Sequence, residues 1–123
     1  MAKPPDGPTI EVGQGAHDPD ELLIGGGLTL EPQHQEMVVN LPEHAREWLF
    51  YEICNRLTAL GVDFGGVALP LQRVRVADPL CVEDLRRSDF LRSLRRVRSG
   101  LQTIGWALRY VLSREKRAPG GLD

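Results

Sequence analysis

The chain has 123 residues, of which 41% are hydrophobic and 26% are charged, and its net charge is −2. This length is typical of one domain with a core large enough to need no disulfide or metal staple, and this composition excludes a disordered protein. No segment approaches the roughly 18 uninterrupted apolar residues of a membrane span, and no apolar run of a signal peptide follows the N-terminus. The two cysteines, Cys54 and Cys81, form no CxxC pair. We therefore expect a cytoplasmic protein.

The charge is unevenly distributed along the chain. Residues 1–72 carry a net charge of −8, whereas residues 73–123 carry +6. This asymmetry indicates either an acidic or nucleic-acid partner for the C-terminal half, or two halves that neutralise each other within one fold. We favour mutual neutralisation.

The ends of the chain are rich in proline and glycine. Residues 1–8 contain three prolines, and residues 118–123 contain a proline followed by two glycines. We expect a disordered N-terminal segment at 1–8, one domain at 9–117, and a flexible tail at 118–123.

Short apolar runs between turn residues predict strands in the first third of the chain. Residues 9–12 form a first strand in this prediction. The runs 21–24 and 28–31 flank Gly25–Gly27 and predict a hairpin, and residues 35–40 predict a further strand. Residues 72–76 alternate apolar and polar side chains, which predicts another strand.

Two helices are predicted, separated by these strands. Apolar residues at three- and four-residue spacing predict a helix over 42–60, which Gly61 would end. Asp78 followed by Pro79 resembles a helix start. A long amphipathic helix is predicted over 88–116. We therefore expect an α+β fold, in which a small, mostly antiparallel sheet from residues 9–40 and 66–76 packs against these two helices.

The long helix carries two different faces. One face has an apolar seam in a heptad pattern, which is typical of a coiled-coil dimer, but the small and apolar residues beside the seam favour packing inside the domain. Gly100 and Gly105 lie beside this seam, and we expect tight packing there. The opposite face is rich in Trp, Tyr and Arg, the residues enriched in protein interfaces. Its proposed partner-binding residues are Trp106, Tyr110, Arg92, Arg95, Arg96 and Arg109. The N-terminal segment or a loop folded over Trp106 is the alternative interpretation.

The segments with the composition of a chemical site do not form a recognisable motif. The loop from His17 to Glu21 and the pair His44 and Glu47 have metal-ligand residue types without further converging ligands. Gly25–Gly27 lacks the Lys and Ser/Thr of a phosphate loop. We therefore predict no catalytic residue, no metal and no cofactor.

Three functions remain open at this point. The first is a non-catalytic interaction or assembly domain that uses the outer face of the long helix and pairs with a protein partner or a second copy. The second is nucleic-acid binding through the arginine-rich part of this helix. The third is a small-molecule site or an enzyme with an unrecognised active site. We favour the first, without a membrane partner.

Overall fold

The computed structural model describes residues 9–14, 20–83 and 85–117. The predicted N-terminal segment 1–8 and tail 118–123 lie outside these residues. The elements follow one another as β1 (Thr9–Gln14), β2 (Glu21–Thr29), α1 (Pro32–Val39), α2 (Glu43–Leu60), β3 (Asp63–Gly65), β4 (Arg73–Cys81) and α3 (Arg87–Arg117). The predicted α+β class is confirmed, with a short additional helix.

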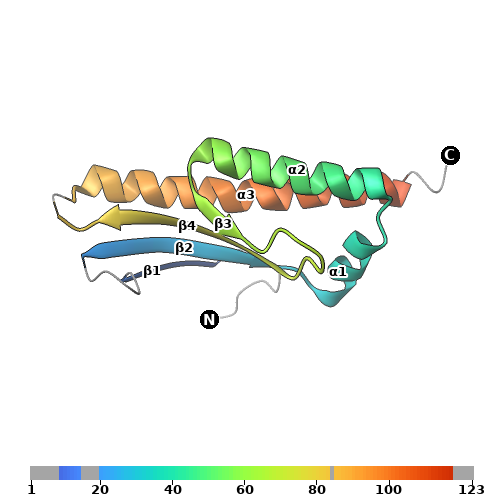
Figure 1. Cartoon of the computed structure of the whole chain (residues 1–123), viewed down its shortest axis with the longest axis horizontal. Helices are drawn as coiled ribbons and strands as arrows, with labels where there is room; N and C mark the ends of the chain where they lie inside the picture. The colour runs from blue at the N-terminus through green and yellow to red at the C-terminus, as the bar shows by residue number, and fades with distance from the viewer. Residues whose placement is uncertain (1–8, 15–19, 84, 118–123) are drawn as a thin grey trace.

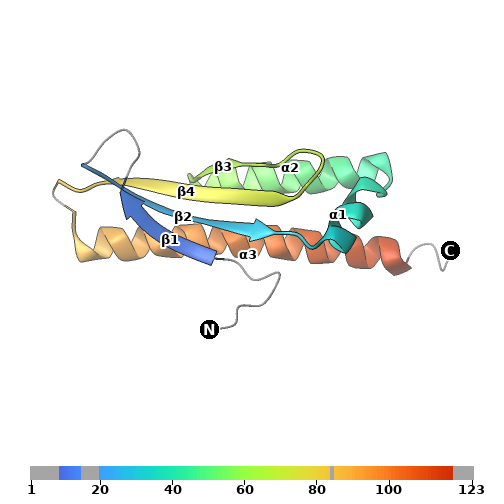
Figure 2. The same ribbon diagram turned by 90° about the horizontal axis from the view of Figure 1, so that it is seen from below.

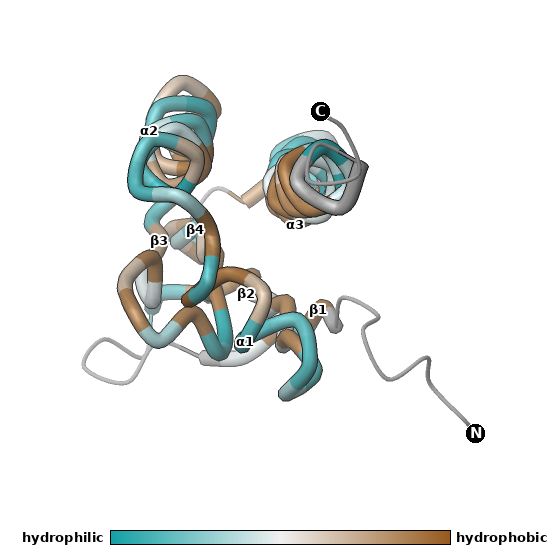
Figure 3. The backbone as a smooth tube through the Cα atoms, turned by 90° about the vertical axis from the view of Figure 1, so that its right-hand side faces the viewer, coloured by the Kyte–Doolittle hydropathy of each residue, from teal (hydrophilic) through white to brown (hydrophobic). Residues whose placement is uncertain are grey.

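The strands form one antiparallel sheet in the order β1-β2-β4-β3. Figure 1 shows α2 and α3 lying side by side along one face of this sheet, and Figure 2 shows the other face without a helix in front of it. The end-on view in Figure 3 places α2 on the β3 side and α3 nearer β2 and β1. The fold therefore has two layers, and each helix keeps one side toward solvent.

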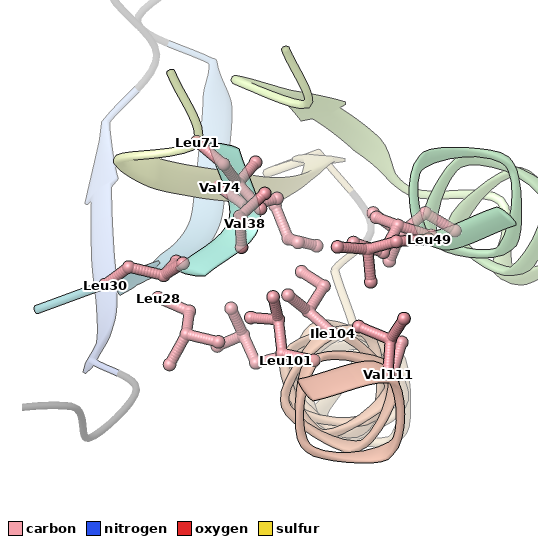
Figure 4. Packing of buried hydrophobic residues seen from close by; sticks show 14 of the residues in the cluster. Leu28, Leu30, Val38, Leu49, Leu71, Val74, Leu101, Ile104 and Val111 are labelled. Carbon is pink, nitrogen blue, oxygen red and sulfur yellow. The ribbon is translucent and has the colours of Figure 1, made fainter. Parts of the chain in front are cut away.

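The core lies between the two layers. Figure 4 shows Leu28, Val74, Leu49 and Ile104 pointing toward one another from β2, β4, α2 and α3. The heptad seam of α3 supplies Val97, Leu101, Ile104, Leu108 and Val111 to this core, each at most 7% exposed. The seam is thus buried within the chain, as the prediction of internal packing required, and it does not form an exposed coiled-coil surface.

The helix predicted over 42–60 is confirmed as α2. Pro42 precedes its first turn, and Gly61 ends it in the left-handed conformation at φ 77°, which a glycine adopts without steric cost. The buried side chains Ala45, Leu49, Ile53 and Leu57 form one stripe along α2. The helix predicted over 88–116 is confirmed as α3, which is one residue longer at each end.

The predicted hairpin at Gly25–Gly27 is wrong, because β2 runs straight through the three glycines. β2 is a central strand that pairs with β1 on one side and β4 on the other along this stretch, so backbone hydrogen bonds on both edges hold the glycines extended. The Arg73 side chain covers Gly27 and donates a hydrogen bond from Nη1 to Thr29 Oγ1 at 2.7 Å. A long neighbouring side chain thus occupies the space left by glycine.

Two further predictions are wrong. Residues 35–40 were predicted as a strand but belong mostly to α1, which has Pro32 in its first turn, where a missing N–H costs no hydrogen bond. Asp78 and Pro79 were predicted to start a helix but lie in β4. β3 pairs with β4 only as far as Ala77, so Pro79 lies where β4 has no partner strand on that side among the described residues.

Candidate functional site

The outer side of α3 exposes the two aromatic side chains predicted to face away from the core. Trp106 is 45% exposed and Tyr110 is 40% exposed. With 3.6 residues per turn, Trp106 lies nearly opposite the buried stripe of Val97, Ile104 and Leu108. Trp106 is thus open to solvent among the described residues, whereas the N-terminal segment 1–8, predicted as one possible cover, lies outside them.

The exposed rings form a stack that bridges the two helices. The Trp106 and Tyr110 rings are 5.4 Å apart between centroids with an interplanar angle of 16°, and Trp48 of α2 lies 5.3 Å from Tyr110 at 43°. These separations are in the range of favourable aromatic pairs. The stack fixes the rotamers of large rings that remain half in solvent, and a rigid aromatic surface loses little entropy when a partner covers it.

An arginine lies over each of two rings of this stack. The Arg56 guanidinium carbon lies 5.3 Å from the Trp106 ring centroid, and that of Arg114 lies 5.6 Å from the Tyr110 centroid. Arg56 also pairs with Glu52 at 2.7 Å, and Arg114 donates to the Tyr110 hydroxyl at 3.1 Å. The guanidinium groups therefore extend the aromatic surface, and Glu52 balances the charge of Arg56.

A third exposed aromatic side chain comes from α2. Tyr51 is 68% exposed and lies opposite the buried stripe of α2. A depression of about 260 Å³ lies nearby, between α2 and α3, and Trp48, Tyr110 and Arg114 are among the residues that line it. We name Trp48, Tyr51, Trp106 and Tyr110 together the aromatic face.

The sequence prediction missed half of this face. Trp48 lies in the apolar pattern of α2 and was assigned to the core, to which it contributes as a partly buried residue. Tyr51 lies outside the apolar positions of this helix and was not singled out. The three-residue spacing of Trp48 and Tyr51 could have indicated an aromatic pair, because residues three apart on a helix are neighbours on its surface. Their relation to Tyr110 depends on the packing of α2 against α3, which no local pattern contains.

The predicted arginines do not form one patch. Arg95 is exposed on the outer side of α3, and Arg92 is exposed with a weak contact to Asp89 at 3.7 Å. Arg96 turns toward the sheet and pairs with Asp78, and Arg109 lies over Gly105 on the flank that faces β2. The four predicted arginines therefore have different surroundings: Arg92 and Arg95 face solvent, Arg96 is held by Asp78, and Arg109 borders a groove.

The Asp78 contact is a polar link between β4 and α3. Asp78 is 6% exposed, and its Oδ2 accepts hydrogen bonds from Ser93 Oγ at 2.6 Å and Arg96 Nη1 at 3.1 Å. Ser93 is 1% exposed, so its hydroxyl is out of reach of a substrate. Burial of the carboxylate is compensated by these two donors, and this arrangement serves to hold the helix on the sheet.

The described residues contain no group of three or more His, Cys, Asp or Glu side chains placed to hold a metal ion. His44 and Glu47 lie on the solvent side of α2. Most of the loop from His17 to Glu21 is outside the described residues. Within the described part of the chain, no helix is long and apolar enough to cross a membrane.

Comparison with known proteins gives a family and a fold. The family model "Uncharacterized conserved protein (DUF2299)" matches residues 1–108, and the chain belongs to this family. An uncharacterized protein from Methanothermobacter thermautotrophicus, known from its crystal structure, superposes with a TM-score of 0.73 at 21% sequence identity. The superposition covers 82% of this chain and 72% of that chain. At this identity the likeness concerns the fold alone. No match was found among curated proteins.

Proposed function

We propose that this member of the DUF2299 family is a non-catalytic assembly domain that forms a homodimer through its aromatic face. The observation that carries the proposal is the ring stack of Trp48, Tyr110 and Trp106, which the fold orders and leaves between the two helices at the surface. Clustered Trp, Tyr and Arg side chains supply most of the binding energy in protein interfaces.

Charge on the two helices favours a second copy as the partner. The solvent side of α2 carries the exposed carboxylates of Glu43 and Glu47 in its first two turns, and α3 carries the exposed Arg114 near its end, at the same level along the helices. A homodimer built on a two-fold axis uses the same surface twice, so this surface must complement itself. The acidic start of α2 laid against Arg114 near the end of α3 meets this requirement.

One arrangement of two copies brings opposite charges and exposed aromatic rings together. The helices α2 and α3 are antiparallel, and the contact of Trp48 with Tyr110 fixes their relative height. A two-fold axis parallel to the helices lays α2 of each subunit over α3 of the other. Rotation about this axis leaves the position of every residue along the helices unchanged, so Trp48 of one subunit is level with Tyr110 of the other. Glu47 of the partner subunit then lies near Arg114, and the partner's Tyr51 lies near Trp106.

Size-exclusion chromatography with light scattering tests the proposal. We expect a wild-type mass of twice the 13.7 kDa of one chain. Tyr51→Ala and Trp106→Ala should each weaken association on the order of thirtyfold, as a central aromatic residue does. Tyr51 is the cleaner of the two because it is mostly exposed, so its removal should leave the circular dichroism spectrum unchanged.

Leu23→Ala is the matched control. Leu23 is 37% exposed on the side of the sheet away from the helices, so this variant should keep the wild-type mass. A wild type with the mass of one chain at every concentration would contradict the proposal. A monomer that shifts a DNA duplex at low salt, and loses this on Arg95→Gln, would establish nucleic-acid binding in its place.

We place the domain in the cytoplasm. Cys54 is half-buried, Cys81 is exposed, and both are free thiols. A reducing compartment keeps such thiols from pairing between molecules. The proposed dimer needs no disulfide.

A further inference from the structure

A second surface feature lies on the other flank of α3. A groove of about 350 Å³ runs between α3, the end of β2 and the start of α1, a size typical of small-molecule sites. Its walls are mostly apolar and comprise Leu28, Leu30, Leu108 and Leu112. Small-molecule sites combine apolar walls of this kind with a few polar groups that orient the ligand.

Gly105 forms part of the wall, and the internal packing of the domain does not account for this glycine. A Cβ atom at Gly105 would meet only the Arg109 guanidinium, at 3.4 Å. At Gly100 the same atom would lie 3.1 Å from Leu57 and 3.3 Å from Val76, both fully buried. The expectation of tight packing is therefore confirmed at Gly100 and wrong at Gly105. Gly105 instead leaves room in the wall of the groove beside the Arg109 guanidinium.

Arg109 supplies a positive charge at the mouth of the groove. Its guanidinium lies over Gly105, and no described carboxylate pairs with it. His34, which also lines the groove, has its Nδ1 3.9 Å from a Glu31 carboxylate, whose negative charge disfavours a second anion there. An amphiphilic anion in this groove would thus be oriented with its charged group toward Arg109.

We propose that this groove binds a straight-chain carboxylic acid of medium length. The tail lies among the four leucines, and the carboxylate accepts hydrogen bonds from the planar guanidinium of Arg109, whose geometry suits a carboxylate. The site is separate from the aromatic face, so it is present in a monomer and a dimer alike.

Binding is measured by titrating the isotope-labelled full chain with hexanoate, octanoate and decanoate and following amide chemical shifts. We expect shifts centred on Gly105 and Leu108, with an affinity that rises about fourfold for each added methylene while the tail is being buried. Octanamide, which is uncharged, should bind at least about tenfold more weakly than octanoate. Equal binding of octanamide and octanoate would overturn the role of the cation, and absence of shifts at the groove would overturn the site.

Two variants test the Arg109 charge and the volume of the groove separately. Arg109→Gln should weaken octanoate at least about tenfold and leave octanamide unaffected, whereas Gly105→Leu should abolish binding of both by filling the groove. Arg95→Gln removes an arginine from the outer side of the same helix and should leave octanoate binding unchanged. If Gly105→Leu does not fold, Gly105→Ala takes its place in testing whether a side chain at this position weakens binding. We expect Gly105→Ala to fold with a raised melting temperature. Octanoate binding that survives Arg109→Gln and Gly105→Ala unchanged would overturn the proposal.

Discussion

The two flanks of α3 meet their neighbours in different ways. Toward α2, the gap between the helices is filled by Trp48 and Tyr110, and arginines lie over the Tyr110 and Trp106 rings. Toward β2 and α1, the space beside Gly105 stays open over leucine side chains. Both flanks use the same long helix and the same amphipathic periodicity. The difference comes from side-chain volume, because large rings close one side and a glycine opens the other.

The same contrast distinguishes two glycines only five residues apart. Each costs about 1 kcal/mol of helix propensity relative to alanine. Gly100 recovers this cost because it lets α3 approach Leu57 and Val76 closely. Gly105 has no such compensation among the described residues. A residue that lowers stability without improving packing is a candidate for function, and this consideration, together with Arg109, directs attention to the groove.

Loss of the polar link under α3 should have the largest effect on stability. Asp78→Ala leaves Ser93 and Arg96 without their acceptor in a mostly buried setting, and we expect a loss of about 3 kcal/mol in the free energy of unfolding. Urea denaturation measures this loss. Asp89→Ala is the control, because Asp89 has only exposed contacts, a 3.7 Å pair with Arg92 and a 3.3 Å hydrogen bond from the Arg86 N–H, whose combined loss should cost about 1 kcal/mol. Equal effects of the two variants would show that burial does not strengthen the Asp78 link.

Alanine at the two glycines should change stability in opposite directions. Gly100→Ala inserts a methyl group against Leu57 and Val76, whose buried positions leave little room to move, and we expect a net loss of about 1 kcal/mol. Gly105→Ala meets no packed neighbour and should gain up to about 1 kcal/mol of helix propensity. Thermal melts of both variants beside wild type measure the difference. The same sign at both positions would remove the contrast between the two flanks.

The smallest effect is expected from charge at the rim of the proposed dimer. Glu47→Lys places a positive charge near Arg114 of the partner subunit and should weaken dimerisation a few-fold, because exposed ion pairs contribute at most about 1 kcal/mol. Arg114→Glu alone should do the same. The double variant exchanges the two charges and should recover most of the wild-type dimer affinity, as measured by sedimentation equilibrium. A double variant as weak as the sum of its parts would exclude the proposed pairing of helices.

The helices were predictable because their signals are local. The apolar spacing of α2 and α3, and the glycine that ends α2, depend on residues within a few turns of one another. β2 was not predictable in this way. Its three glycines favour a turn when considered alone, and only pairing with strands on both sides keeps them extended. Asp78 and Pro79 likewise have the composition of a helix start, but tertiary pairing with β2 places them in a strand.

The candidate site also has parts that local sequence patterns predict and parts that depend on tertiary packing. Trp106 and Tyr110 were predicted to face outward from the helical periodicity of α3 alone, and they do so. The contribution of Trp48 depends on how α2 packs against α3, and the groove at Gly105 depends on where β2 and α1 end. A glycine that permits close packing and a glycine that borders a groove have the same sequence signature, so only the surrounding structure distinguishes Gly100 from Gly105.

The central claim is that α2 of one subunit lies over α3 of another. Isotope-filtered NOE spectroscopy on a mixture of labelled and unlabelled chains tests it directly, because such spectra contain only contacts between subunits. We expect cross-peaks between the Tyr51 ring of one chain and the Trp106 ring of the other. Cross-peaks confined to other surfaces, such as the exposed Ile10 and Val12 of the edge strand β1, would contradict it, and so would a concentrated sample without any contact between subunits.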